Sequence, residues 1–246
     1  MNGCRKAQGF TLIELLVVIA VIALLAAIVV PSISSTITTA RETRCAVELS
    51  SLTKGALFYS IEHDGKLPDI TRKGGPNGNQ QGQFSYWTTK YWKDWFLDEA
   101  GMTRDTFYSA SNKKWNRDDF WDYNGGGAWV VTGRFYFGVP RYNDPDMLGK
   151  LQNAPSDVFL PLFPEAPETE SYYPMLFADL NRQYPSGSGD NWVSPGDPNR
   201  WGSNHLYGTN PWPKINHIAH VDGSVHKIPG TEVKYRFTWA GSEIYW

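Results

Sequence analysis

The feature that most constrains this chain is an apolar run of 21 residues from Phe10 to Val30, in which Glu14 is the one charged residue. A helix rises 1.5 Å per residue, so a run of this length spans the roughly 30 Å hydrocarbon core of a bilayer. A carboxylate at the centre of a membrane costs roughly 2.5–3.5 kcal/mol. The run therefore predicts a membrane-spanning helix over residues 10–30. Its single acidic residue is expected to pair with another group and to have a functional role.

The helical pattern continues well beyond the apolar run, to about residue 63. Gly65 and Pro68 mark its end, and Pro31 lies inside it, where proline removes a backbone donor and tends to kink or locally melt a helix. The apolar residues that recur at roughly helical spacing after Pro31 are Ile33, Ile37, Ala40, Val47, Leu49, Leu52, Ala56 and Tyr59. A helix of about 50 residues is far longer than the usual helix of a globular protein. It therefore needs a role outside its own domain.

The residues around Glu14 resemble the N-terminus of type IV prepilins and type II secretion pseudopilins. The match covers Gly9, Phe10, Thr11, Leu12 and Glu14. The resemblance implies that prepilin peptidase cuts between Gly9 and Phe10, removes residues 1–9 as a leader, and that Phe10 is then N-methylated. It also implies that Glu14 neutralises the terminal amine of a neighbouring subunit during assembly, and that local melting at Pro31 gives a filament its stretch.

Two other interpretations of the N-terminus stay open, a secretory signal peptide and a plain membrane anchor. The basic head, with Arg5 and Lys6, fits all three interpretations. The length of the run and the charge near its start argue against a signal peptide. Ala26-Ala27 argues for one, because it offers small residues for cleavage. The basic head keeps the leader cytoplasmic, so the resemblance implies a single-pass inner-membrane protein with a periplasmic head, later part of a periplasmic pseudopilus or surface filament.

Residues 64–246 are predicted to form one head, which makes the fold class α+β and pilin-like. The long N-terminal helix over 10–63 would pack on a C-terminal antiparallel β-sheet with long loops. Within the head the patterns predict helices over 86–100 and 144–151, strands over 128–139, 174–180 and 233–239, and a hairpin of 215–221 and 224–228. Loops are predicted over 72–83, 118–127, 155–174 and 181–213.

Cysteine and aromatic content add two expectations. Cys4 is lost with the leader, so Cys45 is alone, and the mature chain needs packing or a metal in place of an internal disulfide. We expect Cys45 to be a buried helix thiol, with an intermolecular disulfide as the alternative. The 11 Trp, 13 Tyr and 12 Phe residues are expected to fill the core of a loop-rich head, with a glycan-binding surface as the alternative.

The C-terminal part resembles prepilin-like proteins of the Planctomycetes/Verrucomicrobia type, in which nine residues separate a His from an Asp-Gly pair. The matching segments here are 175–179, His205 and 216–225, but His205 precedes Asp222 by seventeen positions. The expectation is that no cofactor binds. Calcium is the alternative, with Asp179, His205 and Asp222 as candidate metal ligands. His217 and His220 differ by three, so on a strand they point to opposite faces.

Nothing in the sequence indicates an enzyme or a nucleic-acid-binding protein. The chain lacks G-x-S-x-G, H-E-x-x-H and P-loop motifs, which argues against an enzyme. Its net charge is −2 and its basic residues form no stripe along the sequence, which argues against nucleic-acid binding. The predicted function is a structural subunit, pilin or pseudopilin, of a type IV pilus-like or type II secretion filament. The alternatives are a pseudopilin that works as a periplasmic piston and a membrane-anchored, aromatic-rich carbohydrate-binding protein. The partners implied are prepilin peptidase, other subunits, an inner-membrane assembly platform, the lipid bilayer before assembly and, in the last alternative, a glycan.

Overall fold

The structure is a computed structural model that describes residues 11–70, 87–122, 129–136, 175–183, 204–205, 213–233, 235–239 and 242–245. The chain divides into two compact units, Met1–Arg41 and Glu42–Trp246. The leader over 1–9, the loops over 72–83 and 155–174 and the helix over 144–151 fall outside the described residues, as does most of the loop over 181–213.

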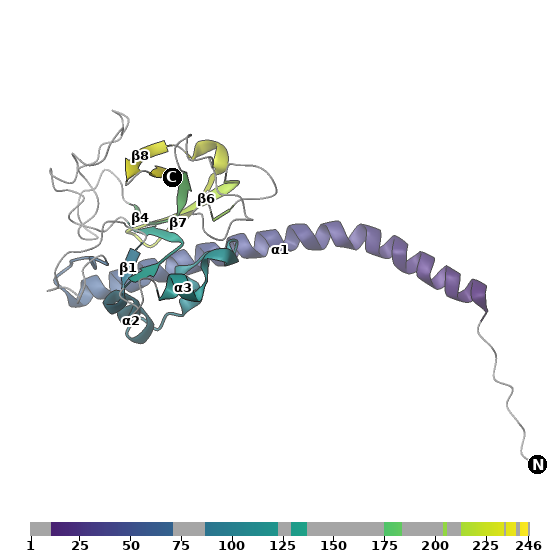
Figure 1. Cartoon of the computed structure of the whole chain (residues 1–246), viewed down its shortest axis with the longest axis horizontal. Helices are drawn as coiled ribbons and strands as arrows, with labels where there is room; N and C mark the ends of the chain where they lie inside the picture. Colours follow the sequence, from purple (N-terminus) through teal and green to yellow (C-terminus); the bar gives the residue numbers. More distant parts are fainter. Residues whose placement is uncertain are drawn as a thin grey trace, which may run out of the picture. The chain divides into compact units, whose positions relative to one another are not determined.

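Helix α1 (Leu12–Glu62) runs for 51 residues and belongs to both units (Figure 1). In the first unit its large apolar side chains between Leu12 and Val30 are 47% to 89% exposed. The helix continues through Pro31. After Pro31, four side-chain hydroxyls donate hydrogen bonds to backbone carbonyls three or four residues earlier in the helix. They belong to Ser35, Thr36, Thr38 and Thr39. The long helix predicted from the sequence is confirmed, and it ends one residue before the predicted limit.

The end of α1 follows from two residues with left-handed backbone. Asp64 has φ 52° and Gly65 has φ 76°, and the Gly65 amide donates to the Ser60 carbonyl at 2.8 Å. A glycine adopts this conformation without the steric cost that a side chain brings. Gly65 is thus the stop that the sequence predicts.

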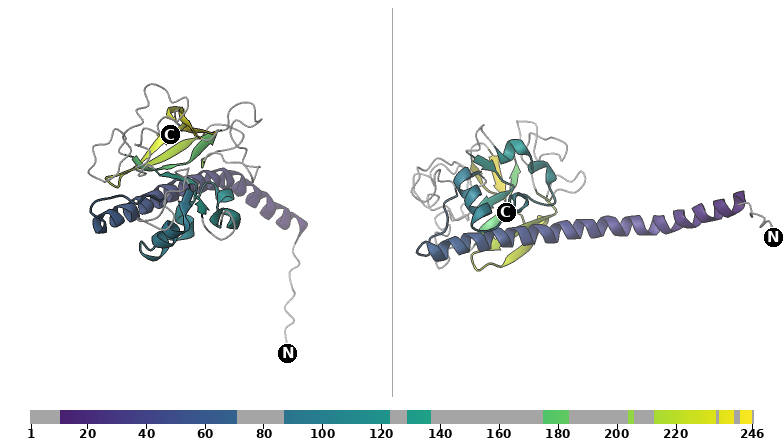
Figure 2. Two further views of the ribbon diagram at one scale, coloured as in Figure 1. Left: turned by 60° about the vertical axis from the view of Figure 1, so that its left-hand side comes forward. Right: turned by 90° about the horizontal axis from the view of Figure 1, so that it is seen from below.

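In the second unit the described strands form three antiparallel sheets (Figures 1 and 2). The four-stranded sheet has the order β3-β4-β6-β7, and its strands are β3 (Arg134–Tyr136), β4 (Met175–Asp179), β6 (Ile215–His220) and β7 (Val225–Pro229). The two-stranded sheet pairs β1 (Trp87–Thr89) with β2 (Trp129–Val131). The third sheet has the order β5-β9-β8, with β5 (Asn181–Gln183), β8 (Tyr235–Trp239) and β9 (Ser242–Tyr245).

Several head elements agree with the sequence patterns. Strand β4 is fully buried, strand β8 falls inside 233–239, and β6 and β7 form the predicted hairpin with Gly223 at φ 85°. Helix α2 (Lys90–Asp98) lies inside the predicted 86–100 helix, but the segment begins as strand β1. The strand predicted over 128–139 is two strands, β2 and β3, that belong to different sheets. Part of the loop predicted over 118–127 is helical, in α3 (Asp118–Trp121).

The core of the second unit is built on one face of α1. Leu49, Leu52, Ala56 and Tyr59 are buried at helical spacing. They pack in one cluster with aromatic side chains of α2 and the following turns and with apolar residues of the sheet, including Trp92, Phe96, Phe107, Trp115, Leu176, Phe177 and Ala219. Among the described residues, the expected aromatic core is confirmed, and each such side chain contributes about 1.5–3 kcal/mol when fully buried.

Gly55 lets α2 and the turn after it approach α1 closely. A Cβ at this position would overlap Met102 Cε and lie 3.2 Å from two ring carbons of Phe96. We expect Gly55→Leu to lower the free energy of unfolding by about 1–3 kcal/mol through overpacking. Lys54→Leu places the same side chain on the exposed neighbouring position and is the control. Chemical denaturation of both variants tests this, and equal stability of the two would contradict a tight contact at Gly55.

Candidate functional site

The first candidate site is the start of α1. Glu14 Oε2 accepts hydrogen bonds from the Thr11 amide and hydroxyl at 2.8 Å each, and the Glu14 amide donates to Thr11 Oγ1 at 3.3 Å. This reciprocal arrangement is a capping box, which satisfies backbone donors that a helix start leaves open. Gly9 and Phe10, the predicted cleavage and methylation positions, lie outside the described residues, and Pro31 lies within α1.

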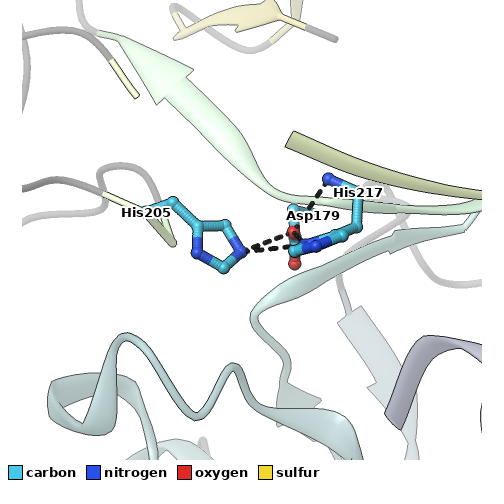
Figure 3. A group of neighbouring side chains, drawn as sticks. All are labelled: Asp179, His205 and His217. Carbon is cyan, nitrogen blue, oxygen red and sulfur yellow. Dashed lines mark hydrogen bonds and ion pairs between the residues drawn. The ribbon is translucent and has the colours of Figure 1, made fainter. Parts of the chain in front are cut away.

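The second candidate site is a buried polar cluster centred on Asp179, the last residue of β4 (Figure 3). His205 Nε2 lies 2.7 Å from Asp179 Oδ2, and His217 Nδ1 lies 2.9 Å from the same oxygen. The two ring nitrogens are 3.2 Å apart. The His217 amide also donates to Oδ2, at 3.0 Å. The cluster thus joins β4, β6 and the turn at 204–205.

The strand pairing explains how these residues meet. Residue 178 pairs with residue 218 across β4 and β6, which places Asp179 beside His217. On the other side of β4, Arg134 of β3 is the direct partner of Asp179 and forms a salt bridge to Oδ1. Asn204 Nδ2 donates to the same Oδ1 at 3.0 Å. Both oxygens of the Asp179 carboxylate are therefore enclosed by donors.

Arg134 connects the cluster to α1. Its Nη2 lies 2.9 Å from Glu48 Oε2, and its side chain is 2% exposed. Glu48 also accepts from Arg44, which lies at the surface with 57% of its side chain exposed. Because the Arg134 guanidinium bridges two buried carboxylates, it holds the second half of α1 against the four-stranded sheet.

Burial and charge act in opposite directions on the pKa values of the central pair. Burial raises the pKa of Asp179, but the nearby charges of His205 and Arg134, together with hydrogen bonds, outweigh burial and hold that pKa well below its usual value. Burial lowers the pKa of His205, but the Asp179 carboxylate outweighs it and raises the pKa to about 9. The carboxylate is therefore held ionised and favours positive charge next to it.

The structure separates the three candidate metal ligands that the sequence suggested. Asp179 and His205 are in contact, whereas Asp222 lies in the exposed turn between β6 and β7, where its Oδ1 accepts from the Ser224 amide at 2.8 Å. Hydrogen bonds from Ser224 lower the pKa of Asp222. His220 and His226 lie near this turn with ring centroids 4.5 Å apart. Asp222 thus shapes the turn and takes no part in the buried cluster.

Sequence reasoning did not select His217. It predicted that His217 and His220 point to opposite faces of a strand, and the structure agrees, because both lie in the unbroken strand β6 three positions apart. Among the described residues, Asp179, His205 and His217 are a group of possible metal ligands whose donor atoms all lie within 4.8 Å of one another. Strand β6 is buried at five consecutive residues, so an alternating pattern could not have selected His217, and its pairing with β4 places it beside Asp179.

Comparisons with known proteins identify the N-terminal segment. Residues 4–30 match the family model of the prokaryotic N-terminal methylation motif. The type IV wide pilus major component PilA4 of Thermus thermophilus is 42% identical over 60 residues, which are 24% of this chain and 46% of that protein. The chain is type IV pilin-like in this segment. It thus matches a little less than half the length of that relative, and no solved structure matches the chain.

The helix that carries the motif also meets a simple criterion for a membrane segment. Among the described residues, α1 is the one helix long and apolar enough to cross a membrane, with a window of mean hydropathy 3.2. Signal sequences and core helices of soluble proteins pass the same test, so length and composition alone do not decide between them. Here the methylation motif coincides with the apolar window, and together they indicate membrane anchoring.

Proposed function

We propose that this protein is a structural subunit of a type IV pilus-like or type II secretion filament. The observation that carries the proposal is the methylation motif at the start of a helix whose first twenty or so residues expose almost only apolar side chains. Such a surface is stable in a bilayer, or buried among equivalent helices in a filament core. The named relative, a major component of a wide pilus, supports the filament.

The proposal gives the two units of the chain separate tasks. The unit Met1–Arg41 anchors the subunit in the inner membrane and then packs among other subunits, while the unit Glu42–Trp246 is the head outside that membrane. Prepilin peptidase and an inner-membrane assembly platform are the partners this function requires. The role is one of assembly, and we assign no catalytic step to any residue.

Peptide mass spectrometry of the N-terminus is the direct test. The full-length protein is purified from its native membrane and from the sheared surface fraction. We expect a mature chain that begins at Phe10 and carries one added methyl group, because the resemblance to prepilins implies cleavage after Gly9. Recovery in the sheared fraction would favour a pilus, and restriction to the cell envelope would favour a pseudopilus. A chain cut near Ala27, or left intact at Met1, would contradict the filament subunit.

A further inference from the structure

The three side chains of the buried cluster point their donor atoms at one place. His205 Nε2, His217 Nδ1 and Asp179 Oδ2 form a triangle with sides of 2.7, 2.9 and 3.2 Å (Figure 3). All three side chains are at most 3% exposed. Two imidazole nitrogens within hydrogen-bond distance of each other, both directed at one carboxylate oxygen, are also the arrangement that a shared cation organises.

Hydrogen bonding alone overfills the Asp179 carboxylate. Oδ1 accepts from Arg134 and from Asn204. Oδ2 is approached by the His217 amide and by one ring nitrogen each of His205 and His217. A carboxylate offers about four lone-pair positions, and these contacts would need one more. If the two ring nitrogens direct lone pairs at a cation, the carboxylate needs one position for that cation and three for the remaining donors.

The surroundings of the triangle resemble the outer shell of a metal site. Arg134 and Asn204 hold the second oxygen of Asp179. Outer partners of this kind fix the orientation of ligating carboxylates and imidazoles.

We propose that Asp179, His205 and His217 bind a divalent transition-metal ion of the zinc class. Two imidazoles with one carboxylate are ligands that suit zinc, whereas calcium takes six to eight oxygens, and this site offers it mainly one carboxylate. The ion would tie β4, β6 and the turn at 204–205 together. Cys45 is a free, buried thiol. The metal would therefore stabilise the head in the way that an internal disulfide stabilises other domains, since metal binding to a folded site stabilises the fold.

The test uses the full-length protein, purified in detergent without a histidine tag. Elemental analysis is expected to find about one zinc per chain. Removal of zinc with a chelator is expected to lower the melting temperature of the head, and added zinc to restore it. The metal-free alternative is a protonated His205 paired with Asp179. A wild-type protein that retains no zinc and gains no stability from it would overturn the proposal.

Paired variants separate this site from adventitious binding. The double variant His205→Gln/His217→Gln is expected to lose the bound zinc. The matched control His220→Gln/His226→Gln removes the histidine pair near the exposed turn and is expected to keep it. Asn204→Ala, which removes only an outer contact to Asp179 Oδ1, is expected to weaken zinc binding about 10–100-fold. If the control variant lost its zinc and the variant of the buried histidines kept it, the zinc site would lie at the exposed turn, and the assignment would be refuted.

A measurement on the wild type guards against variants that fail to fold. X-ray absorption at the zinc edge is expected to show nitrogen and oxygen ligands at about 2.0–2.2 Å, including imidazole. A sulfur ligand at about 2.3 Å would show that Cys45 binds the metal directly and would refute the ligand set proposed here.

Discussion

Replacing Arg134 with alanine is expected to lower the free energy of unfolding by about 3–5 kcal/mol, because it removes the guanidinium that bridges two buried carboxylates. The guanidinium is 2% exposed and bridges Glu48 of α1 to Asp179 of β4. Both carboxylates are themselves buried, with side-chain exposures of 8% and 0%. Water therefore cannot take over the lost contacts without opening the unit between the helix and the sheet.

Arg44→Ala is the matched control for Arg134→Ala. Both arginines bond to Glu48, but the Arg44 side chain is 57% exposed and its second partner, Asp105, is 55% exposed. Exposed ion pairs of this kind contribute about 0–1 kcal/mol, so Arg44→Ala should leave stability nearly unchanged. Chemical denaturation of the wild type and both variants in one buffer measures the difference. Equal losses for the two arginines would contradict the view that burial gives Arg134 its importance.

Local patterns predicted the parts of this fold that local interactions determine. The turn at Asp222-Gly223, the helix stop at Gly65 and the buried strand β4 each depend on a few neighbouring residues. The long helix depends on a period that repeats along one segment. These features need no knowledge of the rest of the chain, and so the sequence was sufficient for them.

The buried cluster depends instead on which strands lie side by side. Arg134 and Glu48 are 86 positions apart, and Arg134 lies in a segment that the sequence described only as strand-like. The pairing of β4 with both β3 and β6 brings Asp179 next to Arg134 and His217. Strand order cannot be read from local periodicity, and the candidate ligand set accordingly contained Asp222 in place of His217. The same limit applies to the strand predicted over 128–139, which the structure divides between two sheets.

Glu14 has a local structural role that any test of assembly has to separate from its charge. It forms a capping box with Thr11 at the start of α1, and loss of a helix cap costs about 0.5–2 kcal/mol. In a filament, its carboxylate would instead neutralise the terminal amine of a neighbouring subunit in an apolar core. Glutamine serves in a capping box as well as glutamate does, so it keeps the cap and removes the charge.

Under the proposed function, Glu14→Gln is expected to reduce assembled protein about a hundredfold or more, because an unpaired amine in an apolar core costs several kcal/mol and each 1.4 kcal/mol is about tenfold. Thr11→Ala keeps the charge, weakens the cap and is expected to assemble nearly as well as the wild type. The amount of each variant in the sheared or pelleted filament fraction, relative to the amount inserted in the membrane, measures the effect. Normal assembly of Glu14→Gln with failure of Thr11→Ala would show that Glu14 acts through the helix cap, and the charge-pairing role would have to be abandoned.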